Sequence, residues 1–200
     1  RNPNESWLRK EIAWNANERT AFIDFQIKPS AEPEGGLATF VANGSQVAFQ
    51  VQNGSSSGQL WAFHGGDSTN GTSQWYQTPG TFQVTAETGN SSNWMRVTLR
   101  QDYDRNLWDL FIDGKLAAVN LSFEGRGDLL KTLEFFGSRH GDTLIDDLSA
   151  QSANMLFPDA DKDGLPDSWE IANGSNPNLY DRDTIKPGTG KSFLDGYLAS

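Results

Sequence analysis

Hydrophobic and polar residues alternate with a period of two in several parts of the chain. The clearest segments are Ala21–Lys28, Gln46–Gln52, Trp94–Arg100 and Leu107–Ile112. In Trp94–Arg100, for example, Met95, Val97 and Leu99 alternate with polar residues. Successive side chains of an extended strand point to opposite faces, so this pattern predicts strands that each bury one face.

A hairpin is predicted where the segment Leu107–Ile112 ends. Asp113-Gly114 follows it directly, and Lys115–Val119 provides the returning strand. Asp-Gly is a preferred pair for two-residue hairpin turns because both positions require positive φ. Shorter candidate strands are Leu37–Ala42, Gln59–Phe63, Phe82–Thr85, Leu133–Phe136 and Thr143–Ser149. Many short strands without a helical pattern between them predict an all-β fold, a two-sheet antiparallel sandwich.

The pattern changes at about residue 157, where the alternation stops. Phe193–Leu198 has apolar residues at the spacing of a short helix, and Asp167–Ala172 is expected to form another helical turn before Asn173-Gly174. The few apolar residues of this part cannot form a core alone. The sequence therefore predicts a sandwich over residues 1–156 and a small C-terminal tail over residues 157–200.

The strongest chemical signal in the chain is the acidic stretch Asp159–Glu170 in this tail. Acidic residues occupy positions 1, 3, 5, 9 and 12 of the twelve-residue pattern, with Gly164 at position 6 for the sharp turn. Dense carboxylate and carbonyl oxygens suit calcium better than zinc or copper. The predicted calcium ligands are Asp159, Asp161, Asp163, the carbonyl of Leu165, Asp167 and Glu170. An acidic, solvated linker is the alternative interpretation.

Composition excludes several other kinds of site and partner. The chain has no cysteine, which rules out thiolate metal sites and a cysteine nucleophile. Its net charge of −10 repels phosphate backbones and anionic lipid, so we expect no nucleic-acid partner. No apolar run approaches the ~18 residues of a membrane span. The chain begins with Arg1 rather than Met, and we expect it to be tethered to further domains of a longer protein.

The tail resembles a known group of calcium-binding repeats. Met155-Leu156-Phe157-Pro158 cannot supply the entering helix of a helix–loop–helix hand. The sequence DADKDGLPDSWE followed by NGSNPN is instead similar to bacterial surface-protein repeats related to thrombospondin type 3 repeats. This resemblance implies that calcium stiffens a short acidic connector. The second loop of that family is lost here, and it stays open whether Asp181 and Asp183 cap the first site or hold a weaker ion.

Four segments of the first part resemble laminin-G-like (concanavalin A-like) jelly rolls. They are Ala21–Pro29, Trp94–Gln101, Trp108–Lys115 and Leu144–Leu148. The resemblance implies a two-sheet antiparallel jelly-roll sandwich, to which the calcium loop and short helices form an appendage. It does not identify a ligand, because such folds include sugar binders, protein binders, spacers and glucanases. Asp146 or Asp147 could hold a structural calcium in such a fold; the alternative is a hydrogen-bonded edge acid.

Catalysis is not expected. Retaining glucanases carry two carboxylates on one face of a strand. The acids in suggestive positions here are Asp109, Asp113, Asp146 and Asp147, and none forms such a pair in the sequence. Both histidines, His64 and His140, lie beside glycines and indicate turns rather than a triad.

Aromatic residues are the candidates for ligand contact. Trp61, Trp94 and Trp108 are expected in the core, and Trp169 is expected to pack the tail onto the sandwich. Trp75 and Tyr76 lie between polar stretches, so we expect them in a loop with one of them exposed to a ligand. Trp14 is a weaker candidate.

These features lead to one principal hypothesis about function. It is a secreted or cell-surface, non-catalytic, calcium-binding module of a larger bacterial surface protein, used for adhesion or carbohydrate binding. Its partner would be a glycan or a surface protein. The alternative is a structural spacer with a calcium-stiffened linker and no ligand, and a glycan-active hydrolase is a third hypothesis. Oligomeric state stays open.

Overall fold

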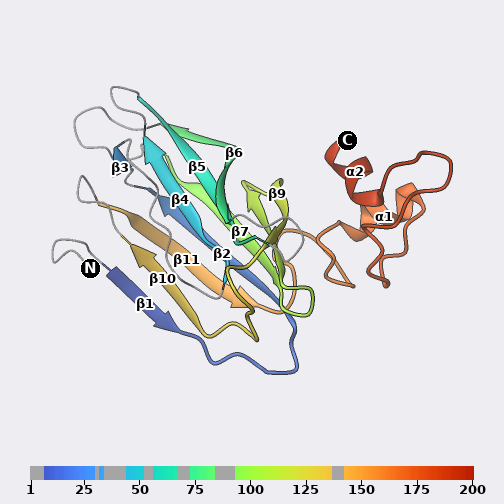
Figure 1. Ribbon diagram of the computed structural model, residues 1–200, viewed down its shortest axis with the longest axis horizontal. Coiled ribbons are helices and arrows are strands. Elements are labelled where there is room, and N and C mark those ends of the chain that lie inside the picture. The colour runs from blue at the N-terminus through green and yellow to red at the C-terminus, as the bar shows by residue number, and fades with distance from the viewer. Residues whose placement is uncertain are drawn as a thin grey trace. The chain divides into compact units, whose positions relative to one another are not determined.

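The chain is described by a computed structural model over residues 7–29, 32–33, 44–51, 56–66, 73–83, 93–136 and 142–200. The chain divides into two compact units, Arg1–Ala150 and Gln151–Ser200 (Figure 1). The predicted strand Leu37–Ala42 and His140 lie outside the described residues.

The first unit is built from strands. They are β1 (Trp7–Glu11), β2 (Thr20–Lys28), β3 (Glu32–Pro33), β4 (Val47–Val51), β5 (Ser57–His64), β6 (Gln74–Gln83), β7 (Met95–Asp102), β8 (Leu107–Ile112), β9 (Lys115–Ser122), β10 (Thr132–Phe136) and β11 (Leu144–Gln151). β11 reaches one residue into the second unit.

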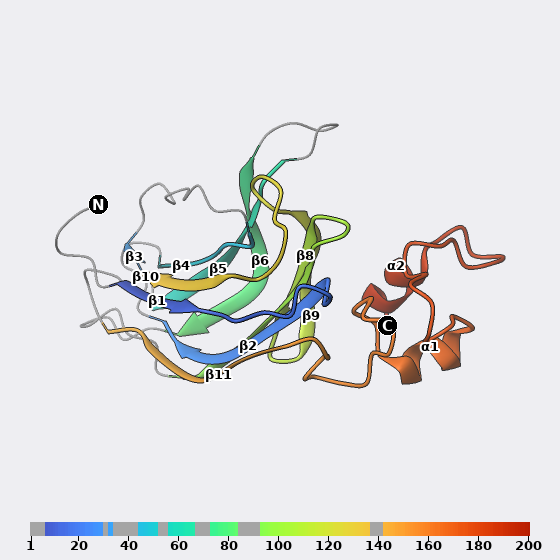
Figure 2. The same cartoon turned by 90° about the horizontal axis from the view of Figure 1, so that it is seen from below.

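The strands form two main sheets, which confirms the predicted all-β sandwich. One sheet has the order β11-β2-β7-β8-β9 and the other β3-β4-β5-β6. Figure 2 shows β4 and β5 in one layer and β2 and β11 in the other. β2 pairs antiparallel with β7, β7 with β8, and β8 with β9; in the other sheet, β4 pairs antiparallel with β5, and β5 with β6. Two features depart from the prediction: the two-residue β3 runs parallel to β4, and β1 and β10 form a separate antiparallel ribbon.

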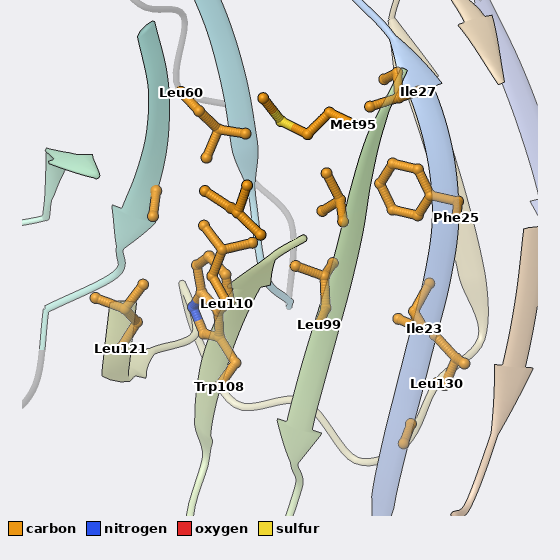
Figure 3. Close-up of a cluster of buried hydrophobic side chains, with 14 of the residues drawn as sticks. Ile23, Phe25, Ile27, Leu60, Met95, Leu99, Trp108, Leu110, Leu121 and Leu130 are labelled. Atoms are coloured by element: carbon orange, nitrogen blue, oxygen red, sulfur yellow. The ribbon is translucent and has the colours of Figure 1, made fainter. Parts of the chain in front are cut away.

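The alternating residues found in the sequence form the core between these layers. Ile23 and Phe25 of β2 point toward the same interior as Leu60 of β5 (Figure 3). The ring of Phe25 meets the ring of Phe135 of β10 edge to face, with centroids 5.5 Å apart, so the ribbon also packs against the core. Each such side chain stabilises the fold by roughly 1.5–3 kcal/mol when it is fully buried.

Two of the tryptophans expected in the core differ in their burial. Trp108 is fully buried, as predicted, whereas Trp94 is 45% exposed, so its prediction was wrong. The physical reason is the alternation itself. Met95 is 5% exposed and belongs to the core, and its neighbour in an extended chain must point the other way. Trp61 is half-buried.

The predicted hairpin at Asp113-Gly114 is confirmed. Ile112 pairs with Lys115, so the loop has two residues. Asp113 and Gly114 have φ of 49° and 77°, the positive values that this kind of turn needs.

The second unit contains two short helices, α1 (Asp167–Asn173) and α2 (Phe193–Leu198), near both predicted positions. Gly174, with φ of 80°, ends α1 in the left-handed conformation. Ser192 and Asp195 cap the first turn of α2 reciprocally. Among the described residues, no helix has the length and apolar character needed to cross a membrane.

Trp169 on α1 packs within the tail. Its ring lies edge-on to that of Tyr197 on α2, with centroids 5.4 Å apart. A Cβ added at Gly196 would lie 3.6 Å from the indole, an ordinary van der Waals distance, so Trp169 lies close to α2 at this glycine. Trp169 therefore joins α1 to α2.

Candidate metal centre

The acidic loop Asp159–Glu170 is held in a tight turn by bonds between its carboxylates and its own backbone. Oδ2 of Asp159 accepts from the N–H of Gly164 at 3.2 Å, and Oδ1 of Asp161 accepts from the N–H of Asp163 at 3.1 Å. Oδ1 of Asp163 accepts from the N–H of Leu165 at 2.8 Å. Lys162 and Gly164 have φ of 62° and 94°, which turns the chain sharply between these bonds. Each of the three carboxylates thus uses one oxygen to fold the loop.

The acidic side chains converge. Ligand oxygens of Asp159, Asp161 and Asp163 lie within 4.8 Å of one another, and so do those of Asp163, Glu170 and Asp181. Asp163 belongs to both groups, which brings five carboxylates to one place. Because α1 begins at Asp167, Glu170 lies on its first turn, where side chains lean back toward the helix N-terminus and the loop.

The interior of this cluster is shielded from water. Asp163 and Glu170 have no exposed surface. Oδ2 of Asp161 and Oε2 of Glu170 are buried and accept no hydrogen bond from the described residues. A buried carboxylate oxygen without a donor costs about 1–3 kcal/mol or more, and a bound cation would remove that cost. The cluster can therefore hold a metal ion.

The electrostatics of the cluster favour a cation as well. Burial, together with the charges of Asp163 and Asp161, raises the pKa of Glu170 to about 8, although a hydrogen bond from Ser175 opposes the rise. Burial is also the largest cause that raises the pKa of Asp161 to about 6, and the charges of Asp159, Asp181 and Asp167 add to it. The part of these shifts that comes from neighbouring carboxylates shows that the site has a negative potential.

Asp181 is the member of the cluster that the twelve-residue pattern could not assign. The hydroxyl of Ser175 lies within hydrogen-bond distance of both Oε1 of Glu170, at 3.1 Å, and Oδ1 of Asp181, and can donate to either. Ser175 follows the end of α1, so the chain must turn back after the helix to deliver Asp181. Asp183, by contrast, is exposed and belongs to neither converging group of the described residues.

Arg182 holds the same turn against the loop. It is fully buried, and its Nη1 donates to the carbonyl oxygen of Asp163 at 2.6 Å. Its guanidinium carbon lies 5.7 Å from the ring centroid of Tyr180. A buried cation beside the acidic loop offsets part of its negative charge and fixes the neighbouring Asp181 in place.

Two of the predicted ligands, Asp167 and the carbonyl of Leu165, are not among the converging side chains. Oδ1 of Asp167 accepts from the N–H of Ala160 at 2.9 Å, and Asp167 is outside both converging groups. Leu165 is fully buried within the turn. Ligation by Asp167 and by the carbonyl of Leu165 stays a prediction.

The aromatic pair Trp75-Tyr76 lies on a strand, so the expectation of a loop was wrong. Both residues belong to β6, whose pairing with β5 places Trp75 opposite Phe63 and Tyr76 opposite Ala62. The rings of Trp75 and Phe63 have centroids 5.2 Å apart. Tyr76 is 42% exposed and lies edge-on to His64. Ladder bonds to β5 override the loop-like composition of this stretch.

The acids and histidine considered for catalysis have structural contacts. Asp109 is fully buried, and its Oδ2 accepts from Nη1 of Arg100 at 3.0 Å. Nδ1 of His64 accepts from the backbone N–H of Ser122 at 3.0 Å. The adjacent Asp146 and Asp147 are exposed on β11, and Oδ1 of Asp146 accepts from the N–H of Asp147.

Trp14, the weaker candidate for ligand contact, is half-buried. Its Nε1 donates to the carbonyl oxygen of Glu18 at 2.9 Å. The indole N–H of Trp14 is therefore already hydrogen-bonded to a residue four positions away along the chain.

Comparisons with known proteins give only distant similarities. No protein-family model and no curated protein sequence matches the chain. Among solved structures it is similar to a sialidase (11% identity, TM-score 0.46), covering 80% of this chain but 15% of the sialidase. It is also similar to the native heptameric SAP-like pentraxin from Limulus polyphemus (10% identity, TM-score 0.39, 88% and 77% covered). A third is the binding domain of Botulinum Neurotoxin DC in complex with SialylT (17% identity, TM-score 0.38, 95% and 46% covered). At these identities and TM-scores the similarities do not bear on function.

Proposed function

We propose that this chain is a non-catalytic, calcium-binding module of a larger secreted or cell-surface bacterial protein. The observation that carries the proposal is the convergence of five carboxylates around buried oxygens of Asp161 and Glu170. The proposed ligands are Asp159, Asp161, Asp163, the carbonyl of Leu165, Glu170 and Asp181, with Asp167 direct or through water.

Calcium is the ion that this donor set suits best. Calcium takes six to eight oxygen ligands in flexible geometry, whereas magnesium keeps several waters and uses one or two carboxylates. Zinc sites take most of their ligands from Cys and His, and the chain has no Cys and only two His. Bound calcium would stabilise the tail by mass action, because the unfolded tail offers no assembled site.

Calorimetric titration tests this proposal. Calcium should bind in preference to magnesium, and Asp163→Asn should weaken binding about 100-fold or more, since Asp163 belongs to both groups of oxygens. Asp183→Asn is the matched control, because Asp183 is an exposed acid of the same tail. Equal calcium affinity in Asp163→Asn and the control would refute the site.

The sandwich is the proposed recognition unit, for a glycan or a surface protein. The exposed Tyr76 and its neighbour Trp75 support this role, because aromatic side chains provide amphipathic contact area for such ligands. A glycan array with wild type and Tyr76→Ala tests it. Binding that survives Tyr76→Ala would exclude Tyr76 as a contact. The absence of binding to any glycan on the array would favour the alternative of a structural spacer with a calcium-stiffened linker.

The contacts of Asp109 and His64 support a non-catalytic role, because both side chains accept hydrogen bonds from other residues of the sandwich. A glycosidase of the common retaining or inverting type would need two carboxylates free to act on one substrate. Hydrolysis of a glycan that the array identifies would overturn this part of the proposal.

A further inference from the structure

A pocket lies at one end of the sandwich, between strands that belong to different sheets. It is lined by Thr81, Phe82, Gln83, Asn93, Trp94, Met95 and Asp113, with a volume of about 290 Å³. Thr81–Gln83 comes from β6 of one sheet, whereas Trp94 directly precedes β7 and Asp113 lies in the β8–β9 turn of the other. This volume is at the small end of the ~300–1,000 Å³ of ligand pockets, so it suits a single ring.

Trp94 gives the pocket an exposed aromatic wall. Its indole is 45% exposed, although Met95 beside it is buried in the core. The ammonium of Lys28 lies 5.9 Å from the ring centroid, a contact that holds the indole in one orientation. An aromatic ring that is both exposed and held in place loses little conformational entropy when a ligand stacks on it.

Asp113 gives the pocket a carboxylate whose direction is set by the hairpin. Its Oδ1 accepts from the backbone N–H of Arg96 at 2.9 Å, and its own N–H donates to the carbonyl oxygen of Arg96 at 2.9 Å. These two bonds tie the turn to the start of β7 and orient the side chain, so that Oδ2 is available to a ligand. Carboxylates form stronger hydrogen bonds with hydroxyl groups than neutral acceptors do.

The remaining wall of the pocket also combines an apolar side chain with polar side chains. Phe82 is 6% exposed and closes the inner side with an apolar ring, while Thr81 and Gln83 are exposed beside it. The pocket therefore pairs apolar surface with hydroxyl, amide and carboxylate groups on elements fixed by strand pairing.

We infer that this pocket binds a neutral sugar ring, with its C–H face on Trp94 and a hydroxyl group on Asp113. A pyranose has this amphipathic character, with an apolar face and a rim of hydroxyls. Neutral sugars are favoured over anionic ones because Asp113 and the net charge of −10 both repel a negative ligand. The inference rests on the proposed recognition role of the sandwich, but places the contact at Trp94 rather than at Trp75 and Tyr76.

Saturation-transfer NMR of the full chain in calcium tests the inference. The probes are glucose, galactose, mannose and N-acetylglucosamine, with sialic acid as the anionic comparison. At least one neutral sugar should receive saturation, and Trp94→Ala should weaken its binding about tenfold or more. Asp113→Asn keeps a residue that tolerates positive φ and can accept from Arg96, and should also weaken binding. Phe136→Ala is the matched control, because Phe136 is an exposed aromatic residue of β10 outside the pocket, and it should leave binding unchanged.

Several results would overturn the inference. They are the absence of transfer to any neutral sugar, transfer to sialic acid alone, and undiminished binding in Trp94→Ala with a native thermal transition. A glycan lost in Tyr76→Ala but retained in Trp94→Ala would refute the pocket while leaving the recognition role intact. Calcium titration of the same variants separates these outcomes from failure of the metal site, because no pocket residue belongs to the converging acids.

Discussion

Replacing Glu170 by Gln is expected to change the stability of the tail in opposite directions with and without calcium. Glu170 has no exposed surface, and its pKa is raised to about 8 by burial and by the charges of Asp163 and Asp161. Without calcium, ionised Glu170 therefore destabilises the folded tail. With calcium, the same charge is a ligand, and the isosteric amide weakens the site.

The sign and size of the calcium-free effect follow from linkage. A carboxyl group whose folded pKa lies above its ordinary 4.5 contributes stability that is present below about pH 4.5 and lost as the pH rises through about 8. At about 1.36 kcal/mol for each tenfold change in acidity, the full shift would correspond to about 5 kcal/mol. Relaxation of the loop around the buried charge recovers part of this energy, so a loss of ~2 kcal/mol is expected. Asp161, with its pKa raised to about 6, acts in the same direction at lower pH.

Hydrogen exchange of tail peptides, read by mass spectrometry and corrected for intrinsic rates, measures this effect. In chelator, wild-type tail peptides should exchange faster at about pH 8.5 than at about pH 5. Glu170→Gln should reduce that difference and protect the calcium-free tail at the higher pH. With calcium, the order reverses and the variant becomes the less protected chain. Asp183→Asn is the control, since its exposed side chain lies outside the cluster.

Two results would refute this reasoning. One is protection of the calcium-free wild-type tail that is equal at both pH values or rises with pH. The other is an unchanged pH dependence in Glu170→Gln, which would mean that this carboxyl group does not carry the negative charge of the empty loop.

Three further predictions concern the cluster, the tail and the core. Asp181→Asn should weaken calcium binding about tenfold or more in a calorimetric titration, because a carboxylate oxygen of Asp181 lies close to those of Asp163 and Glu170. A calcium affinity equal to that of the wild type would show that Asp181 is not a ligand. Chelation of calcium should open the tail to trypsin, for example at Lys162, while the fragment before about residue 157 stays folded around its own core. Mass spectrometry identifies the fragments, and digestion of both parts together would contradict the prediction. Leu110→Ala should lower the free energy of unfolding of the sandwich by about 2–5 kcal/mol in a denaturant titration, because Leu110 has no exposed surface, and a loss below about 1 kcal/mol would mean that the site is not packed as described.

The sequence by itself determined the features that depend on neighbours along the chain. Strand β7 could be predicted from Met95, Val97 and Leu99 because alternation is a local property of extended backbone. The β8–β9 turn followed from Asp113-Gly114 for the same reason. The acidic loop could be predicted because its spacing alone allows successive side chains of one turn to meet at a point.

Only the tertiary structure decided which distant residues join these local units. Asp181 reaches Glu170 because the chain turns back after α1, and no spacing rule for the loop contains that return. The ribbon pairs Leu8 of β1 with Phe135 of β10, residues far apart along the chain, so no local pattern could match them.

The tertiary structure also decided which aromatic side chains are exposed. A single sequence shows that Trp94 and Tyr76 are apolar, but the side of the sheet on which each lies depends on strand register. Register is fixed by partner strands: β5 places Tyr76 opposite Ala62, and the burial of Met95 in the core turns Trp94 outward. The acidic loop could thus be predicted from the sequence, whereas the surface that a ligand would meet required the assembled sandwich.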